Sequence, residues 1–330
     1  MCPRCESAGT PVRTATQRAW AGARPLGGAA ILAVLVWRLG TGPFLDGMRQ
    51  LSAWSLLAAT SITVLTTVCS AWRWQIVARG LGVGQPLATA VAACYRSQFL
   101  NCVLPGGVVG DVHRGVRHGL DAGDVSRGLR AVAWERAAGL AVFVMLALVG
   151  LLVLDSPLHS VMGWVVAALV VAALCLALIL RALPGRDTSQ WARVVRAGRA
   201  DIRDGLLDRR ALPVVLLTSV VVAAGHASIF LVAAWTTGSA ASSARLWPLA
   251  MLVVLAMVVP LNVGGWGPRE GVAAWAFALA GLGAPQGVAA ATAYGVMGFA
   301  ATLPGAAVLA VDRIGRNLTP RRSDTNTDVK

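Results

Sequence analysis

The sequence predicts an all-α polytopic membrane protein, and three observations lead to this fold class. Of its 330 residues, 56% are hydrophobic and only 13% are charged, about half the charged fraction of a typical soluble domain. Apolar runs of membrane-spanning length recur along the chain. Most basic residues fall in the segments between these runs, as the positive-inside rule requires of a multi-pass protein.

About six full transmembrane helices are expected from the apolar runs. Their expected positions are 26–37, 51–72, 131–154, 160–181, 212–235 and 286–311. The first run is short and depends on its flanks to complete a span. Two further apolar runs, at about 87–104 and 248–260, each lead into a cluster of glycine and proline.

The distribution of arginine predicts the orientation. Five segments hold 23 of the 29 basic residues: 1–25, 73–85, 112–130, 181–211 and 312–330. Three other segments, 38–50, 155–160 and 236–246, hold only Arg38, Arg49 and Arg245. The arginine-rich set is therefore expected on the cytoplasmic side, together with both termini.

This orientation constrains the two apolar runs that lead into glycine clusters. The segment between 73–85 and 112–130 has to enter and leave the membrane on one side, and 248–284 has to do the same from the other side. Two re-entrant helical hairpins that enter from opposite faces are typical of an inverted repeat. The alternative, left open by the sequence, is that 87–110 or 248–284 spans the membrane outright.

The two glycine clusters are the strongest pointer to function. The first is Asn101-Cys102-Val103-Leu104-Pro105-Gly106-Gly107-Val108-Val109-Gly110-Asp111, and the second is Pro260-Leu261-Asn262-Val263-Gly264-Gly265-Trp266-Gly267-Pro268-Arg269-Glu270. Broken backbone at bilayer depth persists only where protein or a water-filled cavity surrounds it. Glycines allow close approach of the backbone, and the N–H groups that follow can face an anion.

Three arginines, Arg96, Arg136 and Arg269, lie within apolar segments. Each costs about 2.5–3.5 kcal/mol at the centre of a membrane helix, so each needs a partner. The nearby acids are Asp111, Glu135 and Glu270. Two interpretations follow: the charges neutralise one another and hold the hairpins in register, or they line a polar cavity that contacts an anionic or zwitterionic headgroup.

Under the second interpretation the substrate-binding set combines residues of both glycine clusters with the charged residues near them. It comprises Arg96, Asn101, Gly106, Gly107, Asp111, Arg114, Glu135, Arg136, Gly264, Gly265, Arg269 and Glu270. No catalytic residue, metal site or cofactor is expected, because the sequence has no His-acid pair at catalytic spacing, no nucleophile elbow and no metal-binding cluster. It also has no ATP-binding motif, so transport would be downhill or coupled to an ion. The net charge of +14 comes mostly from arginines in segments assigned to one side of the membrane, and no basic nucleic-acid-binding motif accompanies it. No nucleic acid partner is therefore expected.

Outside the membrane, residues 1–24 and 313–330 are expected to be disordered tails around a membrane domain at 25–312. Residues 187–210 predict an amphipathic helix, with Trp191, Val195, Ile202 and Leu206 on one stripe. Such a helix would lie at the interface and attract anionic headgroups. A plain basic loop explains the same residues equally well.

The motifs, taken together and in order, resemble the transmembrane, flippase-like domain of lysylphosphatidylglycerol synthases. The residues that carry the resemblance are the first glycine cluster with Arg114, then Glu135-Arg136 with Gly139, then the second glycine cluster. The resemblance covers roughly 25–312 and implies a bacterial inner-membrane protein with re-entrant helices around a polar cavity. Well-studied members of that family move aminoacylated phosphatidylglycerol between leaflets. No synthase domain follows residue 312 here, so a free-standing member is expected.

The expected function is therefore translocation of a phospholipid or lipid-linked carrier, without enzymatic activity. An intramembrane lipid-modifying enzyme is one alternative, with Asp111 or Glu135 as a base. A membrane accessory subunit is another, with the 187–210 helix docking a soluble enzyme. Membrane lipids with anionic or zwitterionic headgroups are the expected partners.

Overall fold

The computed structural model describes residues 29–104, 107–153, 197–198, 200–258 and 266–318. Within these residues the chain is helical and contains no strand. A helix at Ala29–Leu39 is followed by α2 (Gly42–Arg49), α3 (Ala53–Gly80), α4 (Leu87–Val103), α5 (Val109–Asp121), α6 (Val125–Val153), a π-helical turn η1 (Ile202–Leu206), α9 (Ala211–Thr236), α10 (Ser243–Ala256), α11 (Pro268–Leu279), α12 (Ala284–Thr302) and α13 (Pro304–Leu318).

Four of the described helices are long and apolar enough to cross a membrane: Ala53–Gly80, Val125–Leu151, Ala211–Thr236 and the continuous stretch Ala284–Asp312. They match four of the six predicted spans. A fifth is possible if Ala29–Leu39 and Gly42–Arg49, which meet at 99°, form one broken span. The predicted span at 160–181 lies outside the described residues, as do the tail at 1–24, residues 319–330, and residues 187–196 and 199 of the predicted helix at 187–210. Residues 313–318, which were predicted to begin the second tail, continue helix α13.

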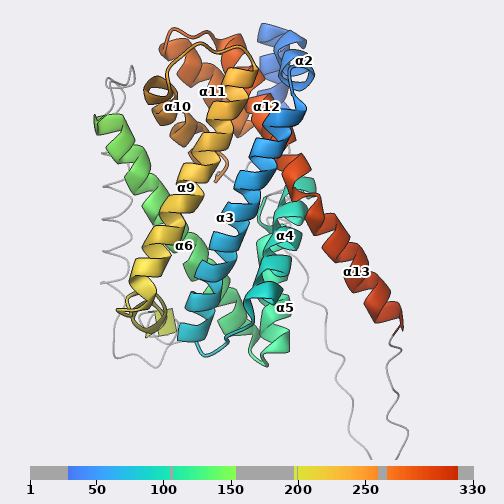
Figure 1. Ribbon diagram of the computed structural model, residues 1–330, viewed down its shortest axis with the longest axis vertical. Coiled ribbons are helices and arrows are strands. Elements are labelled where there is room, and N and C mark those ends of the chain that lie inside the picture. The colour runs from blue at the N-terminus through green and yellow to red at the C-terminus, as the bar shows by residue number, and fades with distance from the viewer. Residues whose placement is uncertain (1–28, 105–106, 154–196, 199, 259–265, 319–330) are drawn as a thin grey trace, which may run out of the picture.

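The long helices α3, α6 and α9 lie side by side along the length of the molecule, and α12 packs against α3 and α9 (Figure 1). Large apolar side chains on these helices face outward, such as Trp54, Leu217 and Met145, with 76%, 63% and 60% of their surface exposed. Apolar residues this exposed on several adjacent helices are expected where the surrounding solvent is lipid.

Two helical hairpins occupy opposite ends of this bundle (Figure 1). Helices α4 and α5 pack together near the end where α3 finishes, and α10 and α11 pack together near the end where α3 begins. The interruption between α4 and α5 begins at Leu104, whose extended backbone is what a following proline imposes. The predicted helix breaks at both glycine clusters are therefore present.

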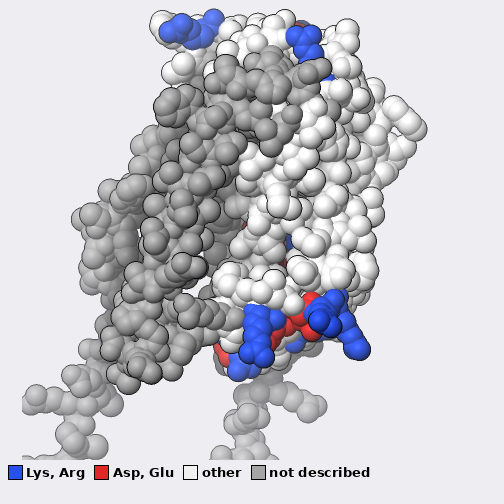
Figure 2. Space-filling model, turned by 90° about the vertical axis from the view of Figure 1, so that its left-hand side faces the viewer, with Lys and Arg blue, Asp and Glu red and all other residues white. Residues whose placement is uncertain are grey.

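On the described surface, charged side chains gather mainly at the ends of the molecule. Figure 2 shows basic and acidic side chains at the end that carries α5, a few basic ones at the opposite end, and a largely uncharged surface on the described atoms between them. The segments 73–85, 112–130 and 203–210 lie near the same end (Figure 1). The structure thus places these arginine-rich segments together, as the charge distribution predicted.

The core is divided into two parts. The first lies among α9, α10, α11 and α12, where Phe230 contacts both Phe277 and Tyr294. The second lies among α3, α4 and the start of α6, around the fully buried Trp74. Each hairpin therefore has its own apolar support, and the space between the two cores is available for a cavity.

The close approach of α4 and α5 depends on Gly110. A Cβ atom at this position would overlap the backbone carbonyl oxygen of Ser97. We expect Gly110→Ala to destabilise the protein by about 1–3 kcal/mol, the usual cost of overpacking. Gly298→Ala is the matched control, because a Cβ there meets no atom within 4 Å. Thermal unfolding in detergent should show a lower midpoint for Gly110→Ala alone. Equal midpoints would mean that the two helices separate easily.

Candidate functional site

A cavity of about 790 Å³ lies between the tips of the two hairpins. Gly107 and Val108 line it from the first hairpin, and Val258 and Trp266 line it from the second. Helices α4 and α5 of the first hairpin, α10 and α11 of the second, and the long helices α3, α6, α9 and α12 also supply lining residues. The volume falls in the range of cavities that hold small ligands. We call it the central cavity.

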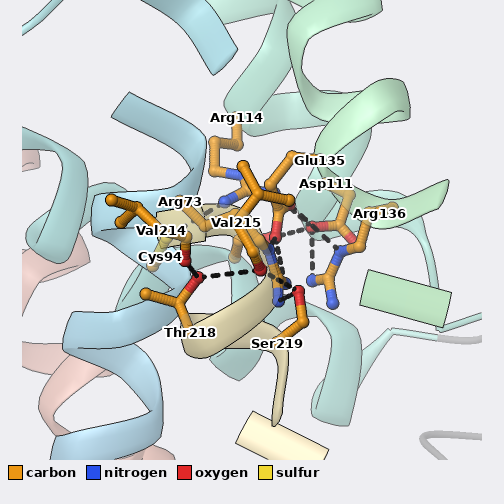
Figure 3. Close-up of polar contacts among 11 residues, drawn as sticks. Arg73, Cys94, Asp111, Arg114, Glu135, Arg136, Val214, Val215, Thr218 and Ser219 are labelled. Atoms are coloured by element: carbon orange, nitrogen blue, oxygen red, sulfur yellow. Dashed lines mark hydrogen bonds and ion pairs between the residues drawn. The ribbon is translucent and has the colours of Figure 1, made fainter. Parts of the chain in front are cut away.

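One wall of the central cavity carries five charged side chains, which we call the ion-pair cluster: Arg73, Asp111, Arg114, Glu135 and Arg136. They come from α3, α5 and α6 and converge on one another (Figure 3). Another part of the wall is apolar, with Leu140, Phe143, Val222, Ile229 and Phe299. The cavity is therefore amphipathic.

Glu135 is the buried centre of the ion-pair cluster, with 1% of its side chain exposed. Its Oε1 accepts a hydrogen bond from Arg73 Nε at 3.0 Å, and its Oε2 accepts one from Arg114 Nη2 at 3.0 Å. Arg73 Nη1 also donates to Ser219 Oγ at 2.9 Å. Two arginines thus share one carboxylate, which offsets the cost of burying them.

Asp111 is the second acid of the cluster. Its Oδ1 accepts from Arg136 Nη2 at 2.7 Å and from Ser97 Oγ at 2.9 Å, while Asn101 Nδ2 donates to Oδ2 at 3.1 Å. Asn101 also accepts from the Gly110 N–H at 2.7 Å, which fixes the start of α5 against α4. The first glycine cluster therefore places Asp111 within hydrogen-bond distance of Arg136.

The ion-pair cluster has three arginines and two carboxylates, and so carries one net positive charge. Arg136 is the most accessible of the three arginines, with 51% of its side chain exposed against 4% for Arg73 and 2% for Arg114. A buried positive charge with an accessible guanidinium is suited to an anion, because arginine donates in a fork that matches phosphate and carboxylate.

The second hairpin contributes Arg269 and Glu270, which follow the break between α10 and α11. Arg269 Nε donates to Glu270 Oε1 at 2.9 Å, and Glu270 Oε2 accepts from the Gly267 N–H at 2.7 Å. The pair is buried, with 3% and 0% of the side chains exposed. Glu270 therefore caps α11 and neutralises Arg269 at the same time.

Aromatic rings surround the Arg269 guanidinium, which lines the central cavity. Its Cζ lies 4.7 Å from the centroid of the Trp266 ring and 5.7 Å from that of Tyr294. A side chain at Gly295 would overlap the guanidinium, so glycine makes room for it. His226 Nδ1 lies 3.2 Å from the Tyr294 hydroxyl and extends the polar lining across to α9.

The structure brings most of the predicted site residues together around the central cavity. Asn101, Gly107, Asp111, Arg114, Glu135, Arg136 and Arg269 all line it, and Glu270 is paired with Arg269. Gly106, Gly264 and Gly265 lie outside the described residues.

Arg96 is the exception, and its predicted place beside Arg136 and Arg269 is wrong. It is buried and paired with Asp312 of α13, on the other side of α4. The reason is helical rotation. Cys94, Asn101 and their neighbours face the central cavity, whereas Arg96 shares a different stripe with Thr89, Ala92 and Ala93.

Arg73 was missed by the sequence analysis, which placed it in the basic loop 73–85. The helix α3 continues to Gly80, so Arg73 lies well inside it. Gly139 leaves room for its guanidinium on α6. A signal was present in the sequence: Trp74, Val77 and Ala78 continue the apolar pattern beyond the predicted end of the span.

An all-helical chain with apolar spans and a charged, amphipathic cavity between two hairpins defines a polytopic membrane protein with an internal polar site. Comparison with protein families shows which one: the family model described as the lysylphosphatidylglycerol synthase TM region matches residues 25–305, and the chain belongs to this family. Neither the comparison with curated proteins nor that with solved structures found a match.

Proposed function

We propose that this protein moves phospholipids, or lipids on a phosphate-linked carrier, between the leaflets of a bacterial inner membrane. The observation that carries the proposal is that one amphipathic cavity is lined by the tips of both hairpins and holds one net positive charge. A lipid headgroup needs a polar site of this kind to cross the hydrocarbon region, because a charge there is otherwise costly.

In this mechanism the headgroup phosphate binds at Arg136, and the apolar part of the cavity wall contacts the glycerol and the start of the acyl chains. Arg269 provides a second contact on the side of the other hairpin. Asp111 and Glu135 keep the arginines charged and oriented. Both carboxylates already accept hydrogen bonds from two or more side-chain donors, which favours this role over that of a catalytic base.

The two hairpins are proposed to be re-entrant and to enter the membrane from opposite faces, as halves of an inverted repeat around the site. The α4–α5 hairpin would open to the cytoplasm, where the arginine-rich segments and both termini lie, and the α10–α11 hairpin would open to the other side. With two short hairpins in place of full spans, about six transmembrane helices complete the topology.

The test is lipid scrambling in liposomes that contain the purified protein and a fluorescent phosphatidylglycerol. The wild-type protein should expose labelled lipid from both leaflets to a membrane-impermeant quencher. Arg136→Gln should slow the initial rate about 10- to 100-fold, the equivalent of about 1.5–3 kcal/mol for one charge-assisted hydrogen bond. The substitution also removes the net charge of the cluster, while Asp111 keeps Ser97, Asn101 and Arg114 as partners.

Arg127→Gln is the matched control, because Arg127 forms only an exposed pair with Asp124 and lies outside the central cavity. It should scramble at the wild-type rate. A wild-type protein that leaves the inner leaflet protected would overturn the proposed function. Wild-type rates in Arg136→Gln would instead remove the ion-pair cluster from the mechanism.

A further inference from the structure

A second cavity, of about 390 Å³, lies between α4, α5 and α13 at the end of the molecule that carries the arginine-rich segments. Thr89, Ala92 and Arg96 line it from α4, Arg117 lines it from α5, and Val308 and Asp312 line it from α13. Arg114 is the residue that lines both this cavity and the central one. The proposed function does not use this cavity.

Arg96, Arg117 and Asp312 form one group in the second cavity, and Arg114, His118 and Asp121 line it as well. The carboxylate of Asp312 is paired with Arg96 of α4 and lies 2.6 Å from Arg117 Nη1 of α5, so two arginines on different helices hold one acid from a third. Helix α13 can approach this closely because Gly305 contacts the backbone of Tyr95, where a side chain would overlap it. Two guanidinium groups that converge on one acid form a geometry that also fits the oxygens of a phosphate.

The walls of the cavity also contain hydrogen-bond donors that the described residues leave unused. Trp74 Nε1 and Arg114 Nε are buried and have no acceptor within the described part of the chain. Both atoms can only donate, and both residues are at least 98% buried. Arg114 Cζ lies 4.4 Å from the centroid of the Trp74 ring, so the guanidinium lies against this ring. A buried donor without an acceptor is costly and calls for a ligand or an ordered water.

We propose that the second cavity binds a phosphate-type anion, and that Asp312 competes with this anion for Arg96 and Arg117. Binding would release the carboxylate of Asp312 and with it the ionic contact between α13 and the first hairpin. The anion could be the headgroup of a lipid in the adjacent leaflet or a soluble phosphate ester, since both present the same oxygens. The inference concerns binding at a separate site and does not depend on lipid transport.

The test is calorimetric titration of the purified protein in a neutral detergent. All variants carry Arg136→Gln in addition, so that anion binding at the central cavity is suppressed. The probes are inorganic phosphate, glycerol 3-phosphate and a short-chain phosphatidylglycerol. Binding of the first two identifies a soluble anion as a ligand, and binding of the third alone identifies a lipid headgroup. Either result supports the proposal.

Three variants connect the binding to this cavity. Arg96→Gln should weaken binding about tenfold or more, since a charge-assisted donor is lost. Asp312→Asn should strengthen binding severalfold, because the internal competitor loses its charge. Ala92→Phe should weaken binding by filling part of the cavity without removing a charged side chain. Asp124→Asn and Arg127→Gln, an exposed pair elsewhere on the surface, should leave binding unchanged.

A purely structural role for the Arg96–Asp312–Arg117 group predicts a different pattern. Arg96→Gln and Asp312→Asn would then both lower the unfolding midpoint and would change anion affinity equally little. No binding of any probe to the protein, or the same affinity in Arg96→Gln, Asp312→Asn and Ala92→Phe, would overturn the proposal. Ala92→Phe keeps the test decisive if the charge variants do not fold.

Discussion

Glu135→Gln is expected to destabilise the protein by about 3–5 kcal/mol, the cost of removing one partner from a buried ion pair. Glutamine keeps the shape of the side chain but not its charge. Arg73 and Arg114, both buried, would then lose their shared carboxylate, and Asp111, which pairs with Arg114, would be the acid that remains in the cluster. Thermal unfolding of the purified protein in detergent, followed by tryptophan fluorescence, measures the effect as a lower midpoint.

The matched control for this substitution is Asp124→Asn. Asp124 also pairs with an arginine, Arg127, at 3.2 Å, but both side chains are exposed to 40% or more. An exposed pair contributes about 1 kcal/mol or less, so the control should unfold close to the wild type. If Glu135→Gln unfolded at the same temperature as Asp124→Asn, the cluster would not hold α3, α5 and α6 together.

The fold could be predicted from sequence where composition and periodicity decide it. Four of the described long helices coincide with predicted spans, because a membrane helix has to be apolar along its whole length. The breaks near Leu104 and before Pro268 were also predictable, since proline and glycine interrupt a helix in any surroundings. The close packing of α13 against α4 was not, because it depends on Gly305 meeting the backbone of Tyr95.

The site was predictable in its residue types and less so in its pairing. The link between Asp111 and Arg136 follows from the need to neutralise charge in an apolar segment, and the structure contains it at 2.7 Å. The partner of Arg96 could not be deduced from neighbouring acids, because Asp312 is 216 residues away in the chain. Arg73 was not predicted as a site residue because it was assigned to a cytoplasmic loop. Composition alone does not distinguish an arginine in a loop from a buried one.

Substitutions in the buried pair of Arg269 and Glu270 should also change the stability of the protein strongly. Arg269→Met leaves Glu270 as a buried carboxylate without its arginine, and Glu270→Gln leaves Arg269 as a buried cation. Each single substitution should destabilise the protein by about 3–5 kcal/mol. The double variant Arg269→Met with Glu270→Gln should recover most of that loss, because no unpaired charge remains and the glutamine amide oxygen still accepts from the Gly267 N–H.

The same double variant separates the two interpretations of these charges that the sequence left open. If the pair only holds the second hairpin in register, the double variant should regain both stability and lipid scrambling. If Arg269 contacts a headgroup in the central cavity, the double variant should unfold near the wild-type temperature and still scramble at least about tenfold more slowly. We expect the second result, because the Arg269 side chain lines the cavity and Glu270 is fully buried behind it. Thermal unfolding and scrambling measured on the same preparations distinguish the two.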